Sequence, residues 1–394
     1  MPTQIAIGFS QASDPQEAAY QACIQAKNQL NTVQTDLVVL LTSIHYARPE
    51  VLEVVHASLR PHRLVGSSTA GILLSEGVFT RGIGILAINS DLINFGISAI
   101  NAAEIPNVRT AGFELARKVS ADFKSPHRQA CLVFTDRSFH QNSLFIRGCQ
   151  EILGFGLPLI GAVSSDDFKF KKTHQFYQKQ VFSNASVGLV LGGINVAMGS
   201  KHGFKPLGKP RTITRASSNI IHTIDQKPAM HIYEEFMGAE AQQLKKGIFA
   251  SHTALYPLGI YLEEERQYLI KNAVDILADG SIVCQGEVPQ GAEVHLMIGN
   301  RDSCKQSAAD AAQQVKDALG GRQAKLILII ESMARHKILG RLSFLEIQAI
   351  RDILGYTTPT IGMYTFGEIA PFASLNNIKN THMQNESILI LAID

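Results

Sequence analysis

Apolar strands and amphipathic helices alternate along this chain in a pattern that occurs three times. A segment beginning at Leu37 reads as an apolar strand, a polar loop, an amphipathic helix and a second strand that ends in glycine and small polar residues. An ungapped shift superimposes this segment on one beginning at Leu132, and a third copy with a longer first loop begins at Lys325. Each copy closes with another apolar strand. The predicted unit is therefore β-α-β-β, with copies in residues 37–100, 130–199 and 325–394.

A helix between two strands predicts a right-handed parallel crossover, while the direction of the closing strand stays open. The fold class is α/β with mixed sheets, and we expect two sheets packed face to face between helix layers, an αββα-like arrangement. The equivalent glycines Gly66, Gly161 and Gly362 should lie at equivalent strand ends.

The pattern changes between the second and third copies. Short apolar runs there are broken by proline and glycine, and Asp279–Gly280 predicts a hairpin. We place a domain boundary near Gln226, before a helix predicted from Pro228, which gives an N-terminal module of residues 1–226 and a hairpin-rich C-terminal module of residues 227–394. A last helix should precede the third copy and stop at Gly320.

Composition narrows the class of protein. With 394 residues, 45% of them hydrophobic, the chain can build two domains, and its net charge of +2 argues against nucleic-acid and membrane-surface partners. Five widely spaced cysteines without a C-x-x-C motif predict neither a disulfide framework nor a thiolate zinc site. The first residues do not read as a signal peptide, and no apolar stretch is long enough for a membrane span. We therefore expect a cytoplasmic protein.

Two stretches of sequence carry a family resemblance. TIGMYTFGEIAPF (Thr360–Phe372) followed by NNIKNTHMQNESILIL resembles the C-terminal half of the FIST sensory module, and LVVLL…RLVGSSTAG resembles its N-terminal half. The resemblance extends from about Asp36 to the end of the chain. Family members commonly carry cysteine in the segment IIESMAR, where this chain has Ser332.

The resemblance implies an input module of bacterial signal transduction. Such a module binds a small ligand, such as an amino acid, and acts on a signalling protein such as a histidine kinase or a cyclic-di-GMP enzyme. Standalone members of this length include haem-binding proteins that sense nitric oxide, so haem is a possible cofactor. Any chemistry that depends on the missing thiol is in doubt here.

Polar turns follow the second strand of each copy. Ligands of open α/β sheets bind at the carboxyl ends of strands, although glycine and serine also simply serve tight turns. In the third copy, Arg335, Arg341 and Glu368 could grip a zwitterionic amino acid or form a plain salt bridge. The predicted ligand-binding residues are Ser67, Ser68, Thr69, Ser164, Asp166, Arg335, Tyr364, Thr365 and Glu368. A residue at such a turn, Tyr364 included, should carry less core area than one within a strand.

Histidines occupy the loop after the first strand of each copy. His45, His140 and His336 are candidate axial ligands for haem, with a solvated side chain as the alternative. No H-x-x-x-H or H-E-x-x-H pair indicates a catalytic zinc. The basic and aromatic segment Lys169–Lys179 is expected to form an exposed hairpin, which could also dock a partner protein.

The sequence contains few indications of an enzyme active site. It contains no nucleophile elbow and no dinucleotide fingerprint, and a pair such as Ser68 with His45 lacks an orienting acid. We expect ligand sensing without catalysis, passed to a partner by protein contact. The alternative is a hydrolase or transferase that uses the Ser/Thr-rich turns.

Overall fold

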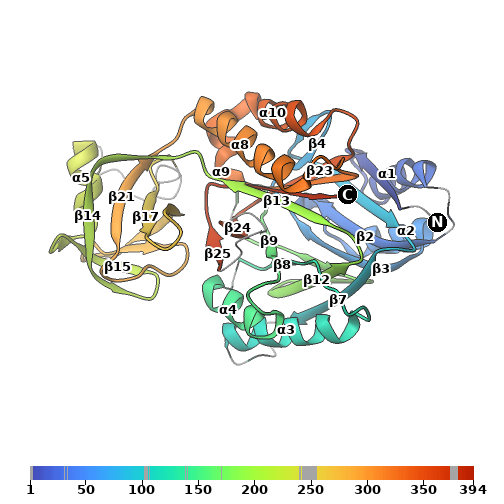
Figure 1. The fold of residues 1–394 in the computed structure, drawn as a ribbon, viewed down its shortest axis with the longest axis horizontal. Coiled ribbons are helices and arrows are strands. Elements are labelled where there is room, and N and C mark those ends of the chain that lie inside the picture. The colour runs from blue at the N-terminus through green and yellow to red at the C-terminus, as the bar shows by residue number, and fades with distance from the viewer. Residues whose placement is uncertain are drawn as a thin grey trace.

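The computed structural model of the chain contains two bodies, a large one built from three similar units and a smaller one made mainly of strands (Figure 1). It describes all residues except 1–2, 31, 33, 102–104, 106, 138, 140, 170, 239–240, 242–254 and 373–379. The α/β class with mixed sheets is confirmed.

Each unit contains the predicted β-α-β-β pattern with three additions: a strand and a helix in front, and a short hairpin before the closing strand. The first unit comprises β1 (Gln4–Ser10), α1 (Pro15–Gln29), β2 (Thr35–Thr42), η1 (Ile44–Tyr46), α2 (Pro49–Leu59), β3 (Pro61–Ser68), β4 (Ile72–Leu74), β5 (Gly77–Phe79) and β6 (Ile83–Asn89). The second comprises β7 (Asn94–Asn101), α3 (Val108–Asp122), β8 (Ala130–Thr135), α4 (Asn142–Leu153), β9 (Leu159–Val163), β10 (Gln175–Tyr177), β11 (Gln180–Phe182) and β12 (Ala185–Gly192). The third comprises β13 (Val196–Lys201), α8 (Arg301–Leu319), β22 (Leu326–Ser332), α9 (Met333–Leu339), η5 (Gly340–Leu342), α10 (Phe344–Leu354), β23 (Thr360–Thr365), β24 (Gly367–Pro371), β25 (Thr381–Gln384) and β26 (Ile388–Ile393).

The predicted crossovers are parallel in all three units, because β2 pairs with β3, β8 with β9 and β22 with β23 in that sense. Each closing strand is antiparallel to the first strand of its pair. Gly66, Gly161 and Gly362 occupy equivalent places on the second strand. A Cβ there would lie 2.0, 2.1 and 2.5 Å from the carbonyl oxygen of the neighbouring strand, so the close approach requires glycine and the predicted equivalence is confirmed.

The short hairpins are exchanged between units. The β4–β5 hairpin of the first unit pairs with β23 of the third, the β10–β11 hairpin of the second pairs with β3 of the first, and the β24–β25 hairpin of the third pairs with β9 of the second. Each six-stranded sheet therefore ends in strands from another unit. The segment Lys169–Lys179 forms the predicted hairpin in part, but its Phe176 is buried in the first unit's core.

Three sheets surround one apolar core, in place of the expected single pair. Val39, Phe134 and Ile330, one from each unit, all belong to this shared core. Alternate residues such as Val38 point the other way and pack against helices, as the period of a strand requires. Helices α1 and α2, α3 and α4, and α8 and α10 cover the outer faces of the three sheets (Figure 1).

The smaller body is inserted between β13 and α8 of the third unit. It comprises β14 (Lys205–Ser217), β15 (Ile220–Ile224), β16 (Lys227–Pro228), α5 (His231–Met237), β17 (Leu258–Leu262), β18 (Gln267–Lys271), β19 (Ala273–Ile276), β20 (Ile282–Cys284) and β21 (Glu293–Ile298). The hairpin predicted at Asp279–Gly280 joins β19 to β20, and the last predicted helix, α8, ends at Gly320 with a φ of 58°. Gln226 lies in the turn between β15 and β16, so the predicted boundary falls inside this body's eight-stranded sheet.

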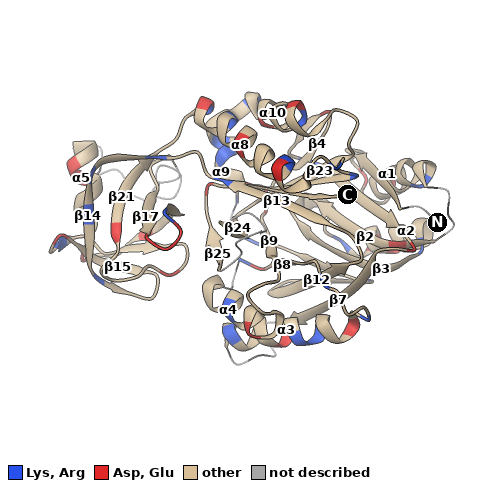
Figure 2. Ribbon diagram, in the orientation of Figure 1, with Lys and Arg blue, Asp and Glu red and all other residues tan. Residues whose placement is uncertain are grey.

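Charged residues of both signs are interspersed on the outer helices, while the strands of the large body carry few (Figure 2). All five cysteines are buried and free. Among the described residues, no helix is both long and apolar enough to cross a membrane.

Candidate functional site

The polar turns of the three units meet where the exchanged hairpins leave their sheets. The Ser67 hydroxyl donates to the Ser164 hydroxyl at 2.7 Å, and the Ser68 hydroxyl donates to the Ser165 carbonyl at 2.9 Å. Thr69 Oγ1 and Ser165 Oγ both donate to the carbonyl of Tyr364, at 2.7 and 2.6 Å. The sequence-predicted residues of the first, second and third units are thus brought together. We call the cluster Ser67–Thr69 with Ser164 and Ser165 the polar centre.

The side chains of the polar centre are buried and bonded to one another. Ser67, Ser68, Thr69 and Ser164 are all 0% exposed. Asp166 accepts hydrogen bonds from the backbone N–H groups of Lys171 and Lys172, and so fixes the following loop. These hydroxyls tie the units to each other, because buried polar groups are stable only with such partners.

Glu368 and Arg335 form no direct ion pair, so the plain salt bridge given as the alternative to amino-acid binding is not present. Glu368 accepts from the Thr365 hydroxyl at 2.7 Å and from the Ser387 backbone N–H and hydroxyl, and burial raises its pKa to about 7. Arg335 instead binds Glu346, and Arg341 is exposed. Arg335 on α9 donates to Glu346 on α10 and to the Glu386 carbonyl, whereas Glu368 on β24 accepts from the next residue, Ser387.

A buried acidic cluster surrounds Arg335. Its guanidinium also lies 3.6 Å from the carboxylate of Glu331, which is completely buried. Burial and the neighbouring Glu346 raise the pKa of Glu331 well above its usual range. Burial raises the pKa of Glu386 to about 8, and this residue has a left-handed φ of 58°.

Sequence reasoning missed Glu331, Glu346 and Glu386. The available signal was a glutamate inside an otherwise apolar strand, in LILIIES. Tyr364, which is completely buried, also belongs to this region. Its hydroxyl makes no hydrogen bond to any of the described residues, and its ring packs against His336 with the centroids 5.1 Å apart.

The candidate haem ligands differ in their surroundings. His45 is exposed, with Nε2 3.1 Å from the Ser13 carbonyl, and it makes no pair with Ser68, whose hydroxyl binds Ser165 and the His174 backbone. His336 is half-buried between Phe168 and Tyr364, and its Nδ1 lies 2.8 Å from the Ser343 hydroxyl.

Burial lowers the pKa of His336, which favours the neutral imidazole. His140 lies outside the described residues. Ser332, at the position where family members commonly carry cysteine, caps α9 by accepting from the Ala334 N–H at 3.4 Å.

A cavity of about 750 Å³ lies between the two bodies. The large body contributes one face of α4 and part of β25, and the smaller body contributes β17, β18 and the segment after β20. None of the sequence-predicted residues lines it. The residues that do are Ser143, Arg147, Gln150, Phe155, Ser218, Leu262, Leu269, Lys271, Glu287, Val288, Pro289 and residues 380–383.

Polar groups converge on this inter-domain cavity from both sides. Ser143, Arg147 and Gln150 are spaced i, i+4 and i+7, so they share one face of α4. Arg147 forms an ion pair with Glu287 at 3.3 Å across the cavity, and the buried side-chain nitrogen of Gln150 has no hydrogen-bond partner among the residues that the structure describes. Lys271 is 1% exposed, and its amine donates to the Met383 carbonyl at 3.2 Å. Burial lowers the pKa of this amine to about 8.

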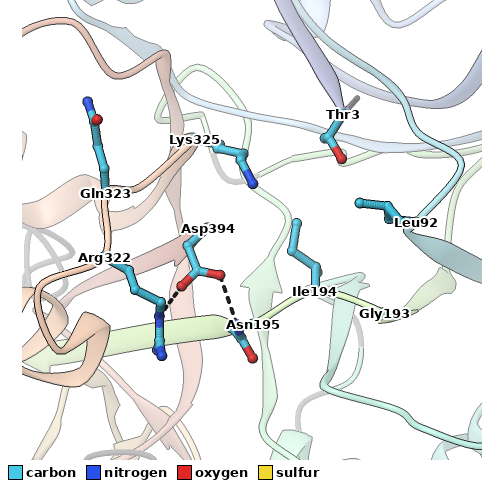
Figure 3. Close-up of a pocket in the computed structure, with 9 residues that line it drawn as sticks. All are labelled: Thr3, Leu92, Gly193, Ile194, Asn195, Arg322, Gln323, Lys325 and Asp394. Atoms are coloured by element: carbon cyan, nitrogen blue, oxygen red, sulfur yellow. Dashed lines mark hydrogen bonds and ion pairs between the residues drawn. The ribbon is translucent and has the colours of Figure 1, made fainter. Parts of the chain in front are cut away.

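A smaller cavity, of about 360 Å³, lies at the other end of β22 from Glu331 (Figure 3). Arg322, one of the two cations in its lining, is paired with Asp394, which also accepts from the Asn195 amide at 3.1 Å. The inter-domain cavity is larger and its lining includes a buried lysine, so we take it as the candidate ligand site.

Two family domains account for most of the chain. The FIST N domain matches residues 36–227 and the FIST C domain matches residues 229–371. The protein belongs to the FIST family, whose domains are sensory ligand-binding domains of signalling proteins.

The relatives found by sequence are uncharacterized proteins. One from Mycobacterium tuberculosis is 24% identical over 396 residues, covering 95% of this chain and 96% of the relative. Another, from Methanocaldococcus jannaschii, is 24% identical over 345 residues, covering 83% of this chain and 65% of the relative.

Solved structures show only distant likeness. A cyanuric acid hydrolase from A. caulinodans has a TM-score of 0.40 and 8% identity, with 99% of both chains covered. A chorismatase has a TM-score of 0.36 and 7% identity, with 100% of this chain and 99% of the other covered. At these values neither structure supports an argument about fold or function.

Proposed function

We propose that this protein senses a small ligand in the inter-domain cavity and passes the bound state to a signalling partner by protein contact. The observation that carries the proposal is the cavity of about 750 Å³ between the two bodies, into which a buried lysine and a row of α4 donors converge. Ligand sites occur preferentially at domain interfaces, as concave apolar spaces with a few placed polar groups.

A free amino acid suits the charges of this cavity. Its carboxylate would lie on Arg147 and Gln150, and its ammonium group would lie on Glu287, so the zwitterion would bridge the existing ion pair. Leu262, Leu269 and other apolar residues of the lining would receive its side chain. An amino acid is therefore still the ligand that we propose, but its site is the inter-domain cavity and not the polar centre.

Signalling would follow from a change in the relation of the two bodies. Arg147 belongs to the large body and Glu287 to the smaller one, so a ligand that contacts both stabilises one arrangement of the bodies over others. The partner would be a cytoplasmic signalling enzyme, such as a histidine kinase or a cyclic-di-GMP enzyme, that reads this arrangement.

Haem with nitric oxide is the second candidate ligand. His336 would serve as an iron ligand better than His45, because it is half-buried, burial lowers its pKa, and Ser343 at Nδ1 would leave Nε2 available. Haem would supply the iron at which nitric oxide binds. The protein's contribution would be the orientation of the imidazole by Ser343 and the flanking ring of Phe168.

We propose no catalysis for this chain. The alternative was a hydrolase or transferase that uses the Ser/Thr-rich turns, but Ser68 in the first of these turns is fully buried and does not pair with His45. An activity screen over ester, amide and phosphoester substrates should show no turnover that Ser68→Ala removes.

The test is a thermal-shift screen of the full chain against each of the twenty standard amino acids, beside an absorption spectrum of protein expressed with haem available. A concentration-dependent rise in Tm with one or a few amino acids is expected, since a ligand that binds only the folded state stabilises it. A Soret band without any amino-acid shift would move haem to first place. If neither a rise in Tm nor a Soret band is observed, both proposed ligands are refuted.

A further inference from the structure

The inter-domain cavity contains a group, Lys271, that is not needed to bind a zwitterionic amino acid. Lys271 is a fully buried amine at the junction of the two bodies, with one described hydrogen bond, to the Met383 carbonyl. Burying an ammonium group is energetically costly. A lysine whose only role was to join the two bodies would therefore be more stable at the solvent-exposed edge of their interface. A desolvated amine next to a ligand cavity is the arrangement that proteins use for nucleophilic lysines.

Lys271 and Ser143 both line the cavity, and the amine is packed closely against the backbone of residue 286. Residue 286 is glycine with a φ of +93°, and the point where a Cβ would stand lies 2.9 Å from the Lys271 amine and 3.8 Å from Ser143 Oγ. A side chain at residue 286 would press on the amine, so glycine there leaves Lys271 unobstructed beside the Ser143 hydroxyl of the α4 donor row.

We propose that Lys271 captures 2-oxo acids in the inter-domain cavity as a reversible Schiff base. This rests on the proposed function only in using the same cavity. An amino acid and its 2-oxo acid share the carboxylate and the side chain, so the α4 donors Arg147 and Gln150 and the apolar wall would hold both. The two ligands differ at the α-carbon, where the oxo acid presents an electrophilic carbonyl.

The covalent step balances without any other reactant. The lone pair of the neutral Lys271 amine attacks the carbonyl carbon, and a C–N bond forms as the C=O π electrons move to oxygen. Proton transfer from nitrogen to oxygen gives a carbinolamine, which loses water to leave a C=N bond. Addition of water reverses the sequence and releases the 2-oxo acid, so capture needs neither oxidant nor reductant.

The groups around Lys271 permit a neutral amine. Cys284 on β20 is a neutral thiol because burial raises its pKa to about 12, and His382 on β25 is a neutral imidazole because burial lowers its pKa to about 4. Glu287 is the charged neighbour and favours the ammonium form, but burial outweighs it. Capture should therefore accelerate as the pH rises toward about 8, below the range in which exposed lysines react.

The test is reductive trapping on the full chain, with pyruvate as the probe and cyanoborohydride as the reductant of the C=N bond, followed by peptide mapping. One adduct per chain at Lys271 is expected, formed at least about tenfold faster than at the exposed Lys169. The adduct should be absent in Lys271→Arg and Lys271→Met, whose thermal melts report whether they fold. Mapping of the wild-type chain decides the outcome even where a variant does not fold.

Adducts spread over exposed lysines with Lys271 unmodified would overturn the proposal. Calorimetric binding of an amino acid with no adduct at Lys271 would leave the sensing function standing and remove only the covalent step. An adduct at Lys271 in a protein that binds no amino acid would support the capture of oxo acids and remove the amino-acid ligand.

Discussion

Tyr364 is a core residue, although the sequence predicted it to be a ligand-binding residue at a strand end. The strand-end turn predicted a side chain with little core area, but the ring is completely buried against Leu73, Met333 and Ile347. Tyr364→Ala should therefore lower the free energy of unfolding by about 3–5 kcal/mol, in place of leaving the fold intact.

Tyr364→Phe is the matched control, and should change the free energy of unfolding by less than about 1 kcal/mol, because within the described part of the chain the hydroxyl has no hydrogen bond to lose. Urea unfolding measures both variants. A large loss in Tyr364→Phe would show that the hydroxyl makes a stabilising contact.

The buried glutamates predict how stability depends on pH. Burial raises the pKa of Glu386 to about 8, above the usual 4.5, so between these values the folded protein holds a proton that the unfolded chain has lost. The free energy of unfolding should then fall as the pH rises through this window, by up to about 1.4 kcal/mol per pH unit for this carboxyl.

Glu386→Gln mimics the protonated form and should flatten this dependence, with wild-type stability at pH 5 and higher stability than wild type at pH 8. Urea unfolding at both values measures the effect, and substitution of the exposed Glu50 by Gln serves as the control. Equal pH dependence in wild type and Glu386→Gln would contradict the raised pKa.

At the scale of elements, periodicity predicted most strands and helices but not how the hairpins pair. The three apolar strands that close the units, the crossover helices and α8 follow from residue spacing. The exchange of hairpins does not, because the strand that receives β10 lies in another unit and local pattern carries no signal for that partner. The acidic cluster was missed for the same reason, since Glu331 and Glu346 lie on separate elements joined only by the fold.

Phe176 tests the exchange. It belongs to the second unit but packs in the core of the first, so Phe176→Ala should cost about 3–5 kcal/mol of stability. Amide hydrogen exchange should show the largest loss of protection in β3 of the first unit. Loss of protection confined to the second unit's own sheet would contradict the exchanged arrangement.

At the scale of the whole molecule, three sheets share one core and a separate body is inserted beside them. The sequence predicted the three copies and the hairpin-rich segment, but not a cavity between them. That cavity draws on α4, on β25 and on the inserted body, which lie far apart in the sequence. The serine-rich turns could be recognised in the sequence from their residue types, but they are buried, and the cavity that can admit a ligand lies between the two bodies.

The central claim is that the ligand binds between the two bodies and not at the polar centre. The most direct measurement is calorimetric titration of the amino acid that gives the largest thermal shift into wild type, Arg147→Gln, Gln150→Leu and Ser67→Ala. We predict that the two α4 variants weaken binding at least about tenfold, about 1.4 kcal/mol, while Ser67→Ala binds as wild type does. Unchanged binding in both α4 variants with loss in Ser67→Ala would contradict the account and return the ligand to the polar centre.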